Sequence, residues 1–333
     1  MTGITRHRIA IIGCGGVSEM HFRGYLAHKD RIQIVAAVDP SVDRQQWVTA
    51  TFGISSTFAS IADALAGADF DVAVVCTPSH VRLEAVEQLA AAGKHVFVEK
   101  PLADSVASAI QIVEVAERAG VTLAVDQNFR YHYAFGHARD AIRDGRIGRV
   151  VSMDHRELMW REVTGWRAEQ AHHALSVMGV HWLDGFRFIL DRQADWLVGT
   201  THRSAAMDAT GETDASIHVR FGDVGVNYSQ SFSSRVERVE TIVIGEEGTL
   251  VFDYDHLEIH TANGTEIIQN AWAGDGKPES AFLGLNDLLT AIEAGGQPSN
   301  SGTDNIRTLS LLEAAYVSAA TGDLVRFTEG VLS

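Results

Sequence analysis

Residues 9–18 read Ile-Ala-Ile-Ile-Gly-Cys-Gly-Gly-Val-Ser, a short apolar strand that leads into a glycine turn and then a helical pattern. Gly13 permits the tight turn, and Gly15 lets a ligand approach the backbone because it carries no Cβ. The free backbone N–H groups at the helix start, around Gly16 and Val17, suit a pyrophosphate. Ser18 stands where the G-x-G-x-x-G pattern has its third small residue. The stretch therefore predicts a dinucleotide-binding turn.

An acidic residue supports this prediction. Asp39 ends the second predicted strand, followed by Pro40. A carboxylate at this position can accept both ribose hydroxyls of NAD and repel the 2′-phosphate of NADP. NAD is therefore the expected cofactor. NADP stays as the alternative, since Ser41 and Arg44 could serve a 2′-phosphate.

The first 125 residues alternate apolar runs with helical stretches. The runs are Ile9–Ile12, Ile34–Val38, Val72–Cys76, His95–Val98 and Thr122–Val125, and the helical stretches are Val17–His28, Val42–Thr51, Ile61–Ala66, Val81–Ala92 and Ser105–Ala119. Continuous short runs are typical of parallel strands buried on both faces. This alternation predicts an α/β fold, with a doubly wound parallel sheet of the Rossmann type over residues 1–125.

The pattern changes in the second half. Alternating runs predict strands at Val150–His155, Trp196–His202, Ala215–Phe221, Val224–Phe232, Val239–Ile244, Thr249–Tyr254, Leu257–Thr261 and Glu266–Gln269, and helices at Ala174–Leu190, Ala281–Ala294 and Thr303–Thr321. Asn263-Gly264 is a strong hairpin signal. Residues 126–333 are therefore expected to form a second α/β domain with an open, mostly antiparallel sheet, whose last helix could pack back on the first domain.

Composition limits the class of protein. The 333 residues carry 27 basic and 43 acidic side chains, a formal net charge of −16. Such an acidic chain repels phosphate backbones, which argues against nucleic-acid binding. The two cysteines, the lack of a signal peptide and the lack of a long apolar run predict a soluble, cytoplasmic protein without a membrane partner.

The strand at residues 95–98 ends in Glu99-Lys100-Pro101. In an open parallel sheet, ligands bind beyond the carboxyl ends of the strands. Lys100 is therefore expected where the nicotinamide would lie. Position alone leaves a surface turn with an incidental lysine as an equal alternative.

Several motifs together resemble the Gfo/Idh/MocA family of NAD(P)-dependent oxidoreductases. They are the turn Gly13–Ser18, the segments at residues 76–80 (CTPSH), 92–101 (AGKHVFVEKP) and 127–131 (QNFRY), Gly145–Gly148, and the helix entry at residues 302–304. The resemblance implies a Rossmann domain followed by a substrate domain whose open sheet makes a homodimer or homotetramer. It also implies sugars, cyclitols and related polyols as substrates.

The resemblance also implies roles for single residues. Thr77, Pro78 and His80 would line the cofactor, Glu99 and Gln127 would lie near its nicotinamide end, and Asn128 would lie near the substrate. Lys100 would reach the substrate hydroxyl. Arg130 is either a substrate donor or a member of a structural ion pair.

His181 and Asp184 lie three residues apart in a segment that resembles the helix of the family's substrate domain. Residues at this spacing share a helix face, so both are expected to face one substrate pocket, with Asp184 as a further substrate contact. Histidine titrates near neutral pH, and an ammonium group stabilises an alkoxide, so His181 is the expected general acid/base and Lys100 its electrostatic partner, with the roles exchangeable. Many relatives carry an aspartate one turn earlier, where this chain has Val177.

Trp166 and Arg167 complete the predicted site. A tryptophan can stack on the C–H face of a sugar, and an arginine beside it can donate to hydroxyls. A packed loop anchor is the alternative. The fifteen histidines show no metal-ligand spacing, so no metal site is predicted.

These features favour hydride transfer between nicotinamide and a secondary alcohol of a sugar, cyclitol or sugar derivative. Two alternatives stay open. A redox-neutral enzyme with retained NAD, catalysing epimerisation, elimination or glycosidic cleavage, would be compatible with Val177. A nucleotide or sugar sensor without activity would keep the fold, although Lys100 and His181 argue against it.

Overall fold

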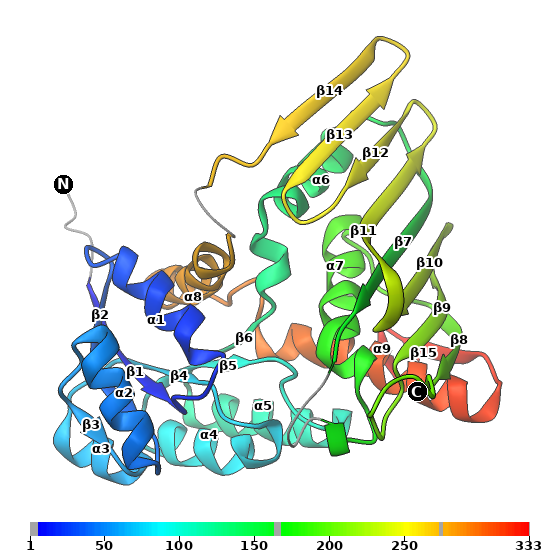
Figure 1. The fold of residues 1–333 in the computed structure, drawn as a ribbon. Coiled ribbons are helices and arrows are strands. Elements are labelled where there is room, and N and C mark those ends of the chain that lie inside the picture. The colour runs from blue at the N-terminus through cyan, green and yellow to red at the C-terminus, as the bar shows by residue number, and fades with distance from the viewer. Residues whose placement is uncertain (1–5, 163–167, 273–275, 333) are drawn as a thin grey trace. The chain divides into compact units, whose positions relative to one another are not determined.

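The computed structural model describes residues 6–162, 168–272 and 276–332. The chain forms two compact units. The first comprises Met1–Asn128 and Asp275–Ile306, and the second comprises Phe129–Gly274 and Arg307–Ser333. Each unit has its own sheet, as Figure 1 shows.

The first unit is a parallel α/β sheet of six strands. They are β1 (His7–Ile12), β2 (Ile32–Val38), β3 (Thr57–Phe58), β4 (Val72–Val75), β5 (His95–Glu99) and β6 (Leu123–Asp126), in the order β3-β2-β1-β4-β5-β6. Neighbouring strands pair in parallel throughout. From β1 the chain adds β2 and β3 on one side of the sheet, and then β4, β5 and β6 on the other. The strand order therefore changes direction between β1 and β4, and folds of this type bind ligands at that point. This confirms the predicted doubly wound fold.

The connecting helices begin and end where local sequence predicts. They are α1 (Ser18–Ala27), α2 (Val42–Phe52), α3 (Ile61–Gly67), α4 (Arg82–Ala91) and α5 (Val106–Ala119). Ser41, Ser60 and Ser105 cap α2, α3 and α5 by accepting a backbone N–H, while Gly53 and Gly120 end α2 and α5 in the left-handed conformation. Both devices satisfy backbone groups that a helix end leaves unpaired.

Helix α8 (Lys277–Ala294) belongs to the first unit, although it lies far along the chain. Its apolar residues Phe282, Leu285, Leu288 and Leu289 join the core beneath α1. The division of the chain therefore differs from the predicted boundary at residue 125, which placed this helix in the second domain. The reason is tertiary, because the apolar face of α8 buries itself against α1 and β6.

The second unit contains a ten-stranded sheet. Its strands are β7 (Val150–Trp160), β8 (Trp196–His202), β9 (Asp214–Phe221), β10 (Val224–Ser231), β11 (Ser233–Gly245), β12 (Gly248–Phe252), β13 (His256–Thr261), β14 (Gly264–Gln269), β15 (Val325–Thr328) and β16 (Val331–Leu332). Only β7 and β10 pair in parallel among the described pairs, and the others are antiparallel. The mostly antiparallel sheet is therefore confirmed.

Several details of the second unit differ from the prediction. No helix is predicted from the sequence at α6 (Tyr133–Arg143), although its buried residues Ala134, Phe135, Ala138 and Ala141 recur at helical spacing. Neither β15 nor β16 is predicted. A π-helical turn (Leu175–Gly179) precedes α7 (Val180–Leu190). The β13–β14 hairpin forms as expected, but its turn is shifted by one residue, so that Gly264 opens β14.

Helix α9 (Gly302–Thr321) begins in the first unit and continues in the second. None of the helices in the described ranges is long and apolar enough to cross a membrane.

The packing of α1 on α8 gives a stability prediction. A Cβ on Gly24 would lie 2.2 Å from the carbonyl oxygen of Pro278. We expect Gly24→Ala to lower the free energy of unfolding by about 1–3 kcal/mol, because the backbone must move. In Gly136→Ala, a control within α6, the new Cβ meets nothing within 4 Å and should leave stability unchanged or raised. Denaturant unfolding measures both, and equal effects would contradict the prediction.

A second prediction concerns acid stability. Glu293 of α8 accepts hydrogen bonds from Arg31 at 2.5 and 2.9 Å and contacts His7 Nε2 at 3.0 Å. The Arg31 guanidinium is the main cause that lowers the pKa of Glu293 from 4.5 to about 2. A carboxyl group with a lowered folded-state pKa stabilises the fold above its unfolded pKa, and this contribution is lost as the pH falls.

The melting temperatures of wild type and Glu293→Gln should therefore differ at pH 7 and converge as the pH falls from about 4.5 to about 2. Glu114→Gln, which removes an exposed pair with Arg118, is the control and should change little at any pH. A difference that stays constant over this pH range would rule out the linkage.

Candidate functional site

The glycine turn has the conformation that its sequence predicts. Gly13 has φ +89°, and a Cβ there would lie 3.1 Å from backbone atoms of Cys76 and Thr77. Gly15 and Gly16 are exposed, and a Cβ on either would meet no protein atom within 4 Å. The protein's own packing therefore does not require glycine at these two positions. Open space above the backbone fits the close approach of a pyrophosphate.

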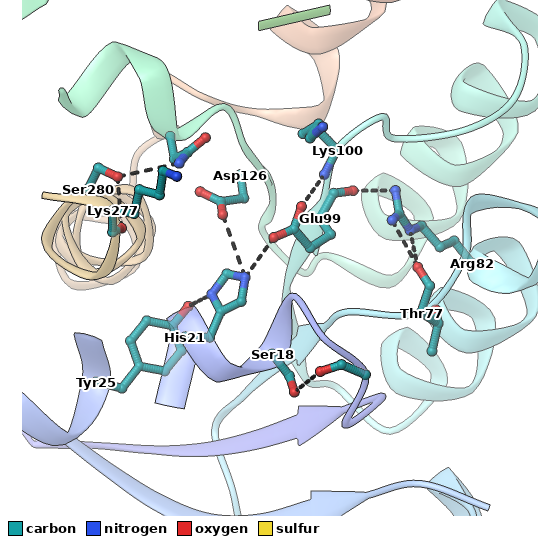
Figure 2. Close-up of polar contacts among 12 residues, drawn as sticks. Ser18, His21, Tyr25, Thr77, Arg82, Glu99, Lys100, Asp126, Lys277 and Ser280 are labelled. Atoms are coloured by element: carbon teal, nitrogen blue, oxygen red, sulfur yellow. Dashed lines mark hydrogen bonds and ion pairs between the residues drawn. The ribbon is translucent and has the colours of Figure 1, made fainter. Parts of the chain in front are cut away.

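Ser18, the departure from the glycine pattern, is fully buried at the start of α1. Its hydroxyl donates to the carbonyl oxygen of Gly15 at 2.6 Å, as Figure 2 shows. The residue is small enough for helix and strand to pack closely, and its polar atom is satisfied. Val17 precedes it and offers no side-chain cap to the first N–H groups of the helix. A ligand anion could accept from donors of this kind.

Asp39 lies at the end of β2, half-buried beside the glycine turn. Its carboxylate accepts the N–H of Cys14 at 2.8 Å and the N–H of Ser41 at 2.9 Å. These bonds hold the acidic side chain against the loop that would carry the pyrophosphate. Pro40 follows it and is exposed.

Arg44 is the residue that the sequence analysis names as a contact for the 2′-phosphate of NADP, but its side chain also contacts other parts of the protein. Its guanidinium donates to the carbonyl of Cys14 and lies 3.9 Å from the ring centre of Trp47. This arrangement favours a role in supporting the glycine turn.

The loop after β4 carries Thr77, Pro78 and His80, of which the last two are exposed. The Thr77 hydroxyl is buried and has no hydrogen-bond partner within the described ranges. The backbone carbonyl of Thr77 accepts two hydrogen bonds from Arg82, at 2.8 and 3.1 Å. A buried hydroxyl without a protein partner is a candidate ligand contact.

Arg82 ties this loop to the next one. Its guanidinium is buried and also donates to the carbonyl oxygen of Glu99 (Figure 2). It donates to the carbonyl oxygen of Pro101 as well. Burial lowers the pKa of Arg82 to about 10, so the group stays charged at neutral pH. The carbonyls on both sides of Lys100 are therefore held by one cation.

Glu99 ends β5 and is only 5% exposed. One of its oxygens accepts the backbone N–H of Lys100 at 3.1 Å, and the other lies 2.8 Å from His21 Nε2. Lys100 itself is half-buried. The predicted lysine thus lies at the carboxyl end of the sheet, on a turn held by Arg82 and Glu99.

Gln127 and Asn128 follow β6 and are buried. Neither amide atom of Gln127 has a hydrogen-bond partner in the part of the chain that the structure describes. Asn128 donates to the hydroxyl of Ser280 on α8 at 3.4 Å. A buried amide that offers one donor and one acceptor fits a polar ligand group such as a carboxamide or a ribose hydroxyl. The residues present therefore fit a nicotinamide dinucleotide.

Sequence reasoning missed one cluster in this unit. His21, Glu99 and Asp126 are buried, and one ligand atom from each lies within 4.8 Å of the others. His21 is one turn into α1, and the two acids end neighbouring strands. No sequence motif links these three positions. The one available signal was that Glu99 and Asp126 each stand at the carboxyl end of a predicted strand, which would place the two acids side by side if the strands are neighbours. The three side chains could hold a metal ion by their spacing, and the absence of a metal site stays a prediction of the sequence analysis.

In the second unit, His181 lies on α7 and is 6% exposed. Its ring stacks on that of Phe129, with centroids 4.1 Å apart and planes at 9°. This contact fixes the plane of the imidazole.

Asp184 is fully buried and belongs to an ion pair. Arg130 donates to both its oxygens at 2.6 Å, and Thr308 donates to one of them at 2.6 Å. Arg187 lies 3.4 Å from the same carboxylate and donates to Thr308 at 2.6 Å. These contacts favour the alternative in which Arg130 belongs to a structural ion pair. The Asp184 carboxylate is held by Arg130, Arg187 and Thr308.

The π-helical turn changes the interpretation of Val177. The backbone N–H of Val180 reaches the carbonyl of Leu175, five residues earlier, so the turn before His181 holds an extra residue. Counting back from His181 therefore does not identify the helix face as it would in a regular α-helix. The predicted substrate contacts Trp166 and Arg167 lie outside the described residues.

Comparison with known proteins decides the family. Residues 7–127 match the oxidoreductase family with an NAD-binding Rossmann fold, and residues 135–251 match the GFO/IDH/MocA C-terminal domain. The chain belongs to the GFO/IDH/MocA family. It is an oxidoreductase, and its first unit is an NAD-binding Rossmann domain.

Two curated members of the family are similar over nearly their whole length. A D-apiose dehydrogenase of Paraburkholderia graminis is 32% identical, with 97% of this chain and 90% of that protein covered. A 1,5-anhydro-D-fructose reductase of Ensifer adhaerens is 30% identical, with 90% and 92% covered.

Solved structures of the family share the fold. An oxidoreductase from Agrobacterium radiobacter, in complex with NAD⁺, L-tartaric acid and magnesium, superposes with a TM-score of 0.90 at 26% identity and covers 97% of this chain and 98% of that one. A levoglucosan dehydrogenase in complex with NADH and L-sorbose has a TM-score of 0.89 at 19% identity, covering 98% of this chain and 100% of that one, and supports the fold alone.

The position of Asp39 predicts cofactor preference. We expect Asp39→Asn to weaken NAD binding about tenfold and to narrow the preference over NADP, because the acceptor charge for the ribose hydroxyls is lost. Titration with NADH and NADPH by fluorescence measures both affinities. Asp43→Asn, which removes an exposed acid two residues beyond Ser41, is the control. Unchanged preference in Asp39→Asn would show that Asp39 does not select the cofactor.

Proposed function

We propose that the protein oxidises a secondary alcohol of a sugar, cyclitol or sugar derivative, with NAD as hydride acceptor. The observation that carries the proposal is the anchoring of the Lys100 turn. Glu99 and Arg82 hold that turn at the carboxyl end of the NAD-binding sheet, next to strand ends where buried polar atoms of Thr77 and Gln127 have no hydrogen-bond partner among the described residues. The names of relatives that act on D-apiose, 1,5-anhydro-D-fructose and inositol support the substrate class.

The cofactor would be held by the glycine turn (Gly13, Gly15, Gly16, Val17 and Ser18), by Asp39 and Pro40, by Thr77, Pro78 and His80, and by Glu99 and Gln127. When bound, NAD supplies the acceptor for a hydride. The protein must then bind the alcohol and remove its hydroxyl proton.

Lys100 and His181 are the proposed catalytic residues. An ammonium group close to the hydroxyl lowers its pKa by stabilising the alkoxide. An imidazole can accept the released proton near neutral pH. The stacking of His181 on Phe129 supports this role, since the ring is held in one plane. The two roles could be exchanged between the residues.

The other predicted substrate contacts receive different support. Asn128 lies at the end of β6, next to Gln127, and remains a proposed contact. Arg130 and Asp184 neutralise each other in a buried ion pair, which supports a structural role for both. Trp166 and Arg167 remain proposed contacts on the strength of their chemistry alone.

The catalytic assignment predicts large losses of activity. We expect Lys100→Met and His181→Asn each to lower kcat/KM by about 10²-fold or more, because each removes acid–base or electrostatic help. NADH formation with sugars, inositols and sugar acids measures the effect. Lys94→Met, at the opposite end of β5, and His137→Asn on α6 are matched controls that should keep full activity. Wild-type turnover in either Lys100→Met or His181→Asn would disprove the assignment.

The same assay separates net oxidation from redox-neutral chemistry. NADH formation with a polyol would establish the dehydrogenase. Purified protein that already contains NAD(H) and forms no free NADH would instead indicate a reaction in which hydride is removed and returned.

We further propose that the protein is cytoplasmic and forms a homodimer or homotetramer through the second sheet. Exposed apolar side chains on β7 and β11, namely Val151, Val236 and Ile244, support an interface there. Light scattering of wild type and Val236→Asp would test it, since a charge at an interface should shift the mass toward the monomer.

A further inference from the structure

A buried polar cluster lies beneath the Lys100 turn. Glu99 and Asp126 are register partners at the ends of the parallel strands β5 and β6, so their carboxyl groups leave the sheet side by side. His21 reaches them from α1, with Nε2 at 2.8 Å from Glu99 and 3.6 Å from Asp126. Its Nδ1 lies 2.8 Å from the hydroxyl of Tyr25. Figure 2 shows the three side chains meeting between α1 and the strand ends.

All three side chains are removed from solvent. His21 is 0%, Glu99 5% and Asp126 1% exposed. Two adjacent carboxyl groups in such surroundings do not both ionise. Burial first, and then the charge of Glu99, raise the pKa of Asp126 well above its ordinary value. The proton of the pair is therefore assigned to Asp126, since the pKa of Asp126 is raised and that of Glu99 is lowered.

Glu99 takes the charge of the pair. Burial alone would raise its pKa, but the hydrogen bond from His21 and the nearby charges of His21, Lys100 and Arg82 outweigh burial and hold the pKa below its ordinary value. The ionised carboxylate then accepts from His21 on one oxygen and from the backbone N–H of Lys100 on the other. Charge-assisted bonds of this kind are stronger than neutral ones.

These bonds join two functional parts of the unit. His21 lies three residues after Ser18, on the helix whose first turn begins at the glycine loop. Glu99 adjoins Lys100. The path from the glycine-turn helix to the Lys100 backbone therefore consists of the side chains of His21 and Glu99 and the two hydrogen bonds of the Glu99 carboxylate.

We propose that His21 is a positioning residue for Lys100 that acts through the carboxyl group of Glu99, with Asp126 completing the cluster. The inference rests on the proposed catalytic role of Lys100. A shift of about 1 Å in a reacting group, caused by a remote change, can cost about 10²-fold in rate. A resident metal is the competing use of the same three side chains, but the hydrogen-bond distance between His21 and Glu99 favours a proton between them.

Amide exchange tests the positioning without any substrate. Pro101 has no amide hydrogen, so hydrogen exchange of the residue pair 100–101 reports the Lys100 N–H alone. We expect His21→Leu and Glu99→Gln to speed its exchange about tenfold or more, because the charged acceptor is lost or released. His21→Gln keeps an N–H donor and should stay near wild type. Asp126→Asn should also stay near wild type, since the amide resembles the neutral acid.

The matched control lies on the same helix. His28 ends α1 and pairs with Glu279 at 2.9 Å, so His28→Leu also removes a histidine–glutamate contact but leaves the cluster intact. It should leave the exchange of Lys100 unchanged. If His21→Leu exchanges like wild type, or if His28→Leu and His21→Leu behave alike, the proposal is wrong. A greater effect of Asp126→Asn than of Glu99→Gln would also overturn it.

Kinetics completes the test. In His21→Leu, kcat should fall about 10²-fold while the NADH dissociation constant changes little, and His21→Gln should recover most of the rate. A loss confined to NADH affinity would assign His21 to cofactor binding instead. Stoichiometric zinc or magnesium, detected by elemental analysis of wild type and absent from His21→Leu, would assign the cluster to a metal. If the wild type oxidises no polyol, the proposed function fails, whereas the exchange data still decide whether His21 positions Lys100.

Discussion

The buried carboxylate of Glu99 is the interaction on which the first unit's site depends. It is the negative centre among His21, Arg82 and Lys100, and it accepts the backbone N–H of Lys100. A buried charge is costly unless it is paired and hydrogen-bonded. The pairing here makes the position of the Lys100 turn depend on a helix and two strands at once. Burial and the charge of Glu99 raise the pKa of the neighbouring Asp126, so the two acids differ although they lie side by side.

The cofactor region depends on a second constraint, which is the close packing of the glycine turn against the loop after β4. Gly13 adopts a left-handed conformation and packs against the loop after β4, while Gly15 and Gly16 face open space. Arg82 then bonds the carbonyls of that loop and of the next one. Three strand ends are thereby linked through backbone groups and one guanidinium. Pre-positioned groups of this kind are what hydride transfer requires from the protein.

In the second unit, a buried carboxylate again organises its surroundings. Asp184 pairs with Arg130 and Arg187 and accepts a hydrogen bond from Thr308. These contacts connect α7 to the segment after β6 and to α9. His181 lies one turn away on α7 and stacks on Phe129, the neighbour of Arg130. The ion pair thus stabilises the backbone on both sides of the stacked rings.

The sequence by itself determined the alternation of strands and helices over residues 1–125 apart from the short strand β3, the glycine turn, and the positions of Asp39 and Lys100 at strand ends. These features are local, because hydrophobic period, glycine and capping residues act within a few positions. Helix α6 was not predicted although its buried residues recur at helical spacing. Helix α8 was assigned to the other domain because its packing partner α1 lies far away along the chain. Only the tertiary structure decided that His21, Glu99 and Asp126 meet, that Arg130 pairs with Asp184, and that a π-helical turn precedes His181. Such contacts depend on which residues the fold brings together from distant segments, and no spacing along the chain records that.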